Sequence, residues 1–93
     1  MLVGGEPVGR LFVITVDQPW TRCRFEPLDS WESVRELFER HNEAGRNGFP
    51  PDQLEATKEI LDRGVELRPS TGLGEPERPF MIYVEGDSAR FRP

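Results

Sequence analysis

The chain has 93 residues and a formal net charge of −5, with one cysteine and one histidine. This length suits a single domain, which on folding buries roughly 60–65% of the surface of the unfolded chain. The acidic balance argues against a general electrostatic attraction to nucleic acid or anionic membranes. No apolar stretch is long enough to span a bilayer, and no segment resembles a signal peptide. The single cysteine, Cys23, excludes an internal disulfide and indicates a reducing compartment, so we expect a cytoplasmic protein.

Two segments near the ends of the chain read alike. Gly5-Glu6-Pro7 precedes an alternating apolar segment at residues 10–17, and Gly74-Glu75-Pro76 precedes another at residues 78–85. Both follow the pattern Arg-x-Phe-x-Ile-x-Val and then an acid. An internal duplication would produce this likeness, and so would two unrelated amphipathic strands that follow Gly-Pro turns. Either explanation predicts a turn and a strand at each end of the chain.

The first segment predicts a β-hairpin that turns at Asp17-Gln18-Pro19-Trp20, where Pro19 fixes φ for a tight reversal. Side chains alternate between the two faces of a strand, so the register of the hairpin assigns each residue to a face. The paired residues on the face expected to be buried are Val16 with Thr21, Ile14 with Cys23, and Phe12 with Phe25. The solvent-facing residues are then Leu11, Val13, Thr15, Arg22, Arg24 and Glu26.

The second segment predicts a hairpin that turns at Gly86-Asp87, a two-residue loop whose leading glycine suits a type II′ turn. This register pairs Val84 with Ala89 and Ile82 with Phe91. The face expected to be buried holds Phe80, Ile82, Val84, Ala89 and Phe91. The solvent-facing residues are Met81, Tyr83, Arg90 and Arg92.

Helical periodicity marks the middle of the chain. Asp29 or Ser30 is expected to cap the first helix, with Glu32 completing a capping box, and Gly45 and Gly48 to end it. Apolar residues at helical spacing predict its buried stripe: Trp31, Val34, Leu37, Phe38 and His41.

A second helix is expected to begin at Pro51 and to stop at Gly64. Its predicted buried stripe is Leu54, Thr57, Ile60 and Leu61. Residues 65–68 follow as a short strand, and residues 68–79 as a loop. The simplest assembly is an α+β domain of ββααββ order, with two layers: an antiparallel sheet of two hairpins, covered on one face by two helices.

Few residues suit catalysis. His41 belongs to the stripe of the first helix, so we expect a histidine at the edge of the core, and Cys23 is expected to be a buried, unreactive thiol. Gly72-Leu73-Gly74 lacks the Gly-Lys-Ser/Thr of a phosphate loop, and no pair of carboxylates stands out as an acid and base. We therefore expect no metal site, no cofactor and no enzymatic activity.

The solvent-facing side of the sheet is the one unusual surface. Arginines with aliphatic and aromatic neighbours are frequent at recognition surfaces, although they also occur on ordinary solvated sheet faces. The candidate partner-binding residues are Val13, Arg22, Arg24, Met81, Tyr83, Arg90 and Arg92. The expected function is a non-catalytic interaction module that binds a protein, either another protein or a second copy of itself. The alternatives are a binder of single-stranded nucleic acid, with Tyr83 as its stacking platform, and a small enzyme or enzyme subunit with its site at the Gly-Glu-Pro loops.

Overall fold

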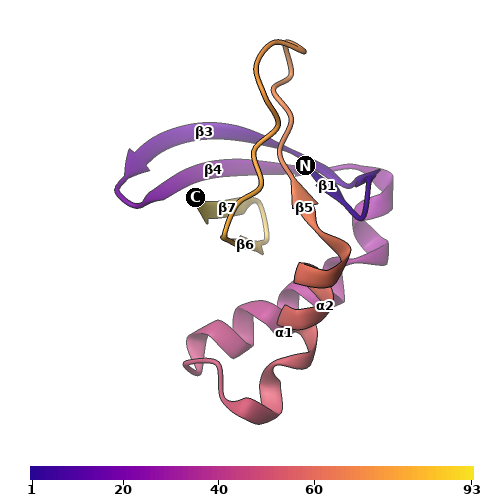
Figure 1. The fold of residues 1–93 in the computed structure, drawn as a ribbon, viewed down its shortest axis with the longest axis vertical. Coiled ribbons are helices and arrows are strands. Elements are labelled where there is room, and N and C mark those ends of the chain that lie inside the picture. Colours follow the sequence, from indigo (N-terminus) through magenta and orange to yellow (C-terminus); the bar gives the residue numbers. More distant parts are fainter.

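The computed structural model describes residues 1–93 as two antiparallel sheets and two α-helices (Figure 1). The larger sheet has the strand order β3 (Gly9–Asp17), β4 (Trp20–Pro27), β7 (Ser88–Arg92) and β6 (Met81–Glu85). The smaller sheet has the order β2 (Glu6–Pro7), β1 (Leu2–Val3) and β5 (Val65–Glu66). The helical middle comprises the 3₁₀ turn η1 (Asp29–Ser33), α1 (Arg35–Arg46), the 3₁₀ turn η2 (Pro51–Gln53) and α2 (Glu55–Arg63). The predicted α+β class is confirmed, and β3–β4, α1–α2 and β6–β7 follow the predicted ββααββ order, with the short strands β1, β2 and β5 in addition. No helix has the length and apolar content needed to cross a bilayer.

The second hairpin has the predicted register. Val84 lies opposite Ala89 and Ile82 opposite Phe91. Gly86 begins the two-residue turn with a positive φ of 60°, which glycine adopts without steric penalty. Ile82, Val84, Ala89 and Phe91 are buried on the side of the sheet that faces the helices, which we call the inner face.

The first hairpin follows its predicted register only beside the turn, where Val16 lies opposite Thr21. Ile14 then forms a β-bulge, and the pairing shifts by one residue between Val13 and Thr15. Beyond the bulge the observed pairs are Val13 with Cys23, Phe12 with Arg24, and Leu11 with Phe25. The predicted pairs Ile14–Cys23 and Phe12–Phe25 are therefore wrong, because an extra residue moves the start of β3 to the opposite face.

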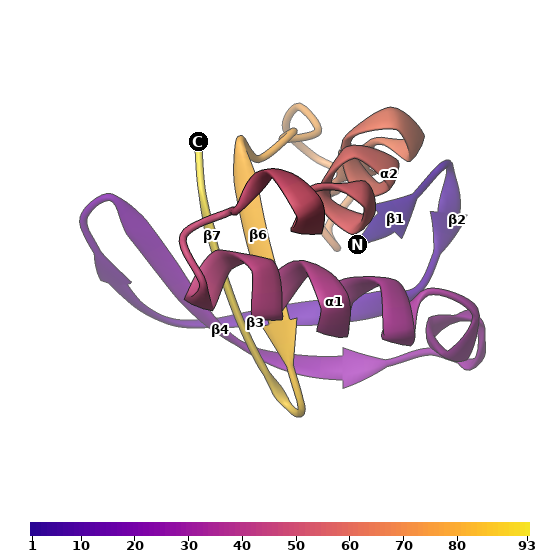
Figure 2. The ribbon, with the colours of Figure 1, turned by 90° about the horizontal axis from the view of Figure 1, so that it is seen from below.

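The bulge changes which residues of β3 are buried. Cys23 and Phe25 are buried as predicted, but Leu11 packs partly against the core and Phe12 is exposed on the outer face. Ile14 and Val16 are also exposed, because the β3–β4 hairpin extends past the helices that cover the rest of the sheet (Figure 2). The bulge and this overhang explain why the prediction that Phe12, Ile14 and Val16 are buried is wrong.

Phe80 was also predicted to be buried and is 66% exposed. Phe80 precedes β6 at the end of the sheet, where its ring lies beside the Arg92 guanidinium group rather than under a helix. Its truncation to alanine would remove little buried surface, in contrast to truncation of a core phenylalanine.

The stripe predicted for the first helix is buried in full. Trp31 joins Phe25 of the sheet to Phe38 of α1, with ring centroids 4.8 and 5.2 Å apart respectively. The predicted capping box is absent, because the chain enters through η1 and no side chain caps either segment. Ser30 instead donates a hydrogen bond to the Glu6 carboxylate, 2.8 Å away, and so links η1 to β2.

The second helix ends at Gly64 as predicted, with a positive φ of 82° at that residue. Its buried residues are Ala56, Thr57 and Ile60. Leu54 is only half-buried and Leu61 is exposed, so the predicted contribution of these two leucines to the core is wrong.

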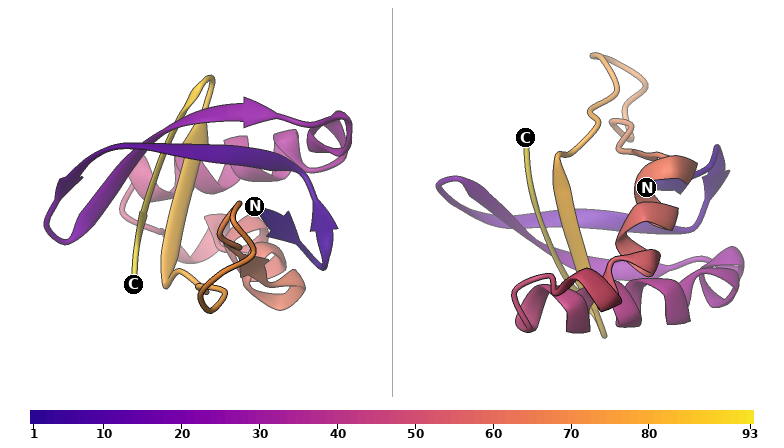
Figure 3. Two further views of the ribbon diagram at one scale, coloured as in Figure 1. Left: turned by 90° about the horizontal axis from the view of Figure 1, so that it is seen from above. Right: turned by 60° about the horizontal axis from the view of Figure 1, so that its bottom comes forward.

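The strand predicted at residues 65–68 is present as β5, and an isolated bridge between Leu67 and Glu77 extends it. Its partner is the N-terminal hairpin, which the sequence pattern did not predict. Met1, Leu2 and Val3 are buried there and close the end of the core beside α2 (Figure 3).

Gly9 packs directly against the ring of the buried Phe25. A Cβ atom at this position would lie 2.2 and 2.5 Å from two carbons of the buried Phe25 ring. We therefore expect Gly9→Ala to lower the unfolding free energy by about 1–3 kcal/mol, the usual range for overpacking. Urea unfolding measures this change, with Lys58→Ala on the exposed side of α2 as the control. An unchanged urea midpoint in Gly9→Ala would contradict the packing described here.

Candidate functional site

Four arginines lie on the side of the larger sheet that faces away from the core. Arg22 and Arg24 come from β4, and Arg90 and Arg92 from β7. Because β4 pairs with β7, Arg22 lies directly opposite Arg90. Like charges in opposite positions of a strand pair destabilise the sheet, so this pair favours an anion between or above the two guanidinium groups. We call these four residues the arginine face.

Aromatic rings hold three of these guanidinium groups. Arg24 lies 4.3 Å from the centre of the Phe12 ring, and Arg92 lies 5.8 Å from that of Phe80. Arg90 contacts two rings, at 5.0 Å from Trp20 and 4.8 Å from Tyr83. Stacking restricts the rotamers of the arginines while the edge of each guanidinium plane keeps its donors available for a carboxylate or phosphate.

The sequence pattern predicts the arginines of this face but not most of these rings. Phe12 and Phe80 were assigned to the core, and Trp20 to a turn. Each aromatic is close in sequence or across a strand pair to the arginine it contacts, but the β-bulge that places Phe12 on the outer face leaves no clear signal in the sequence.

The arginines differ in their acidic partners. Arg22 lies 3.7 Å from Asp17, and Arg24 lies 3.7 Å from Glu26, with all four side chains substantially exposed. Arg90 and Arg92 make no ion pair, and the buried Nε of Arg92 has no acceptor. Exposed ion pairs are weak, so the face as a whole can exchange its internal contacts for an external anion.

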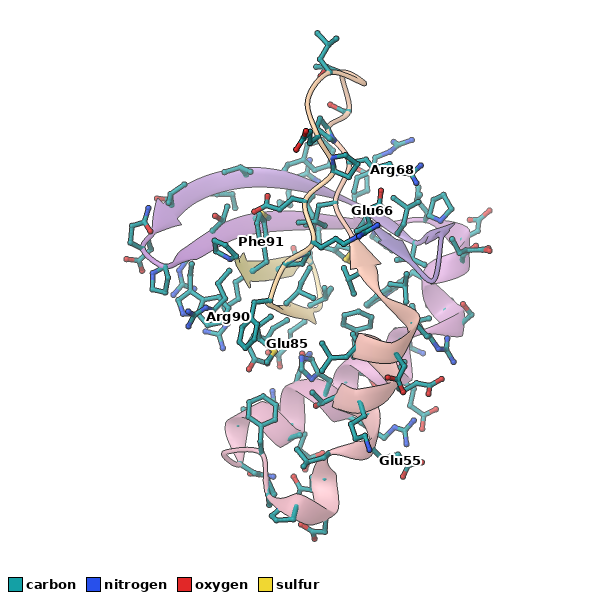
Figure 4. The ribbon with its side chains drawn as sticks, in the orientation of Figure 1. Glu55, Glu66, Arg68, Glu85, Arg90 and Phe91 are labelled. Atoms are coloured by element: carbon teal, nitrogen blue, oxygen red, sulfur yellow. The ribbon has the colours of Figure 1, made fainter.

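A cavity of about 360 Å³ opens where the arginine face meets α1. Arg22 and Arg90 line its sheet side, and Arg46 lines its helix side while pairing with Glu85 at 3.3 Å. Figure 4 labels Glu85 at the end of β6 and Arg90 in the middle of β7, both away from the Glu66–Arg68 pair beside β5. Ser88 supplies a hydroxyl to the same cavity. Its size and donors suit the acidic side chain of a partner.

The remaining predicted site residues have different positions. Tyr83 is half-buried at the rim of the arginine face. Met81 is half-buried and lines a second cavity, of about 200 Å³, beside Phe80 and Leu61. Val13 lies opposite Cys23 and so faces the inner side, away from the arginines.

His41 connects three elements beneath this rim and is only 1% exposed. Its Nε2–H donates to the carbonyl oxygen of Ile82 at 3.0 Å, so Nδ1 accepts from the Thr57 hydroxyl at 2.8 Å. Its ring also stacks on Tyr83, with centroids 5.0 Å apart and planes inclined by 11°. Burial lowers the pKa of the imidazole below its ordinary value of 6.5, while the Ile82 hydrogen bond acts in the opposite direction. His41 is therefore buried with the stripe of α1, as predicted, but it lies inside the molecule rather than at the edge of the core.

Asn42, the next residue of α1, makes the neighbouring contact. Its side-chain amide donates to the carbonyl oxygen of Val84 at 2.6 Å. β6 has no neighbouring strand on this side, so His41 and Asn42 bind the carbonyl groups of an otherwise open sheet edge. α1 thereby holds the strand that carries Tyr83.

Cys23 is buried on the inner face, as predicted, and burial raises the pKa of its thiol. No cluster of three or more His, Cys, Asp or Glu side chains could hold a metal ion. In the two Gly-Glu-Pro segments, Glu6 accepts the hydrogen bond from Ser30, and Glu75 lines a small cavity beside Leu11.

Comparison with known proteins yields no relative. No protein family, no characterised protein and no solved structure matches the chain.

The neutral His41 predicts a pH effect on stability. Since the folded pKa lies below the unfolded value of 6.5, the contribution of His41 is complete above that pH and is lost as the pH falls below it. We expect the difference in unfolding free energy between wild type and His41→Gln to shrink below about pH 6.5. Urea unfolding from pH 5 to 8 measures the difference, and a gap that widens on acidification would contradict a neutral histidine.

The buried Cys23 predicts slow labelling. Because the thiol is covered and its pKa is raised, we expect a thiol reagent to modify the native protein many times more slowly than the urea-unfolded chain. The rate of thiol modification followed by absorbance provides the measurement. Equal labelling rates in the two states would show that the Cys23 thiol is accessible in the native protein and would contradict its burial.

Proposed function

We propose that the protein is a non-catalytic, cytoplasmic interaction module, and that the arginine face binds an acidic segment of a protein partner. The observation that carries this proposal is the direct opposition of Arg22 and Arg90 across β4 and β7, beside a cavity that also receives Arg46. A carboxylate from a partner would neutralise the two opposed cations and use their bidentate donors.

The stacked rings support a protein partner in a second way. Arg90 is held by Trp20 and Tyr83, so it loses little conformational freedom when it binds. Tryptophan, tyrosine and arginine are the residues that most often dominate the binding energy of protein interfaces. Exposed Phe12 and Phe80 add apolar area on either side of the arginines.

Single-stranded nucleic acid is the second candidate, because four aromatic rings accompany the arginines. Tyr83, however, is stacked on His41 and also lies 4.8 Å from the Arg90 guanidinium group, so its ring is less available to a base. A base would stack more readily on Trp20, Phe12 or Phe80. The opposition of cations fits phosphate as well as carboxylate, but the reduced availability of the Tyr83 ring favours the protein partner.

Fluorescence anisotropy with two probes tests the proposal. One probe is a set of labelled peptides that carry paired Glu or Asp residues flanked by leucines, and the other is labelled single-stranded oligothymidylate. We expect peptide binding that weakens at least about tenfold in Arg90→Ala, the effect of a hot-spot residue worth over 1 kcal/mol.

Arg40→Ala provides the matched control, because Arg40 is an exposed arginine of α1 that makes no ion pair. Its affinity should equal that of wild type. Equal loss in both variants would indicate a nonspecific charge effect and contradict the proposal. Binding of oligothymidylate alone, with affinity that falls steeply as salt is added, would support the nucleic-acid candidate instead.

A further inference from the structure

The outer edge of β3 is open and apolar. β3 ends the larger sheet, and no strand pairs with its second side. Three of its apolar side chains are among the most exposed of the chain: Val13 at 63%, Ile14 at 70% and Val16 at 59%. Proteins usually protect a long edge strand with lysine, proline, a bulge or a covering segment, and of the first three β3 has only the bulge at Ile14. Residues 11–16 of β3 contain neither lysine nor proline, so this edge is suited to pairing with another strand.

The bulge at Ile14 determines how two copies of this strand can pair. Before the bulge Arg10 and Phe12 lie on the outer face, and after it Thr15 and Asp17 lie on the same face, because all four pair with β4 residues of that face. Without the bulge, Arg10 and Asp17 would lie on opposite faces, since they are seven positions apart. Leu11 and Val16 share the inner face for the same reason.

These positions match one another in a two-fold antiparallel pairing. When Arg10 of one copy lies opposite Asp17 of the second copy, Leu11 meets Val16, Phe12 meets Thr15, and Val13 meets Ile14. Every flanking pair then brings together residues from the same face, as an antiparallel sheet requires. The two-fold axis repeats each contact, so an Arg10–Asp17 ion pair closes both ends of the apolar centre.

The charged ends are available for this exchange. Arg10 lies 3.4 Å from Glu26 and Asp17 lies 3.7 Å from Arg22, and all four groups are largely exposed. Such pairs contribute little and can be replaced. Release of Asp17 from Arg22 also leaves Arg22 free to bind an external anion.

The loop at residues 68–79 adds apolar contact area to the same edge. It crosses the inner side of β3, where Pro69 and Glu75 line a cavity with Leu11 and Val13, and its tip projects beyond the strand (Figure 1). Leu73, near the tip, is 77% exposed. Pairing of two copies would place each tip over the sheet of the other.

We infer that the protein forms a two-fold homodimer in which β3 pairs antiparallel with β3 of a second copy, in the register that joins Arg10 to Asp17. The two four-stranded sheets then form one continuous sheet. Both arginine faces lie on the same side of it, so the dimer offers two binding surfaces to a partner.

Sedimentation equilibrium over a range of protein concentrations tests the dimer. Wild type should approach twice the chain mass of 10.7 kDa. Arg10→Asp and Asp17→Arg, tested separately, place like charges opposite at both ends and should each raise the dissociation constant at least about tenfold. The double variant restores opposite charges and should return close to the wild-type value.

Three further variants separate this register from other causes of association. Val16→Lys places a charge on the apolar inner side of the edge and should abolish the dimer, while circular dichroism shows a retained fold because Val16 is exposed. Arg40→Asp, a charge reversal on α1, should leave the mass unchanged, and so should Arg90→Ala. A wild type that remains monomeric at high concentration would overturn the inference, as would single reversals that have no effect or a double variant that fails to recover.

Discussion

The contact between α1 and the edge of β6 is the constraint on which the rest of the structure depends. His41 and Asn42 bind successive outward carbonyl groups of β6, those of Ile82 and Val84. His41 also binds Thr57 of α2, so a single buried imidazole joins both helices to the sheet. A buried polar group is costly to leave without a partner, and any displacement of α1, α2 or β6 would break at least one of these bonds. The same imidazole supports Tyr83, and through it the position of Arg90.

The second hairpin and the first helix could be predicted because their local sequence patterns assign to the core the same residues that the folded structure buries. A glycine-led two-residue turn determined one register, and five residues at helical spacing determined the stripe of η1 and α1. The first hairpin has a turn of equal clarity, but one extra residue at Ile14 changed the face of Phe12 and Val13. A strand of consecutive apolar residues carries no signal for such a bulge, because either register offers an apolar face. Leu61 was also predicted wrongly, because α2 buries Ala56, Thr57 and Ile60 and leaves Leu61 exposed.

The candidate site depends on pairing between strands that are distant in the sequence. The sequence identified the arginines through strand alternation, and the fold brings them together because β4 and β7, from opposite ends of the chain, are neighbours at the centre of the sheet. The two exposed phenylalanines, Phe12 and Phe80, occupy corresponding positions in the two similar segments, and each lies beside an arginine of a central strand. The second Gly-Glu-Pro segment lies in a loop whereas the first forms part of β2, so the likeness of the segments extends to their strands more than to their turns.

The two edges of the larger sheet differ, and this difference limits how far association can proceed. α1 occupies the β6 edge with hydrogen bonds from two side chains, so no further strand can be added there. Only the β3 edge can accept a strand, and pairing of two such edges uses both. Growth into a ribbon or fibre requires two open edges in every molecule, which this sheet does not have. In the inferred dimer both β3 edges are paired, so strand addition to the larger sheet stops at two chains, and the apolar edge of β3 carries no hazard of open-ended aggregation.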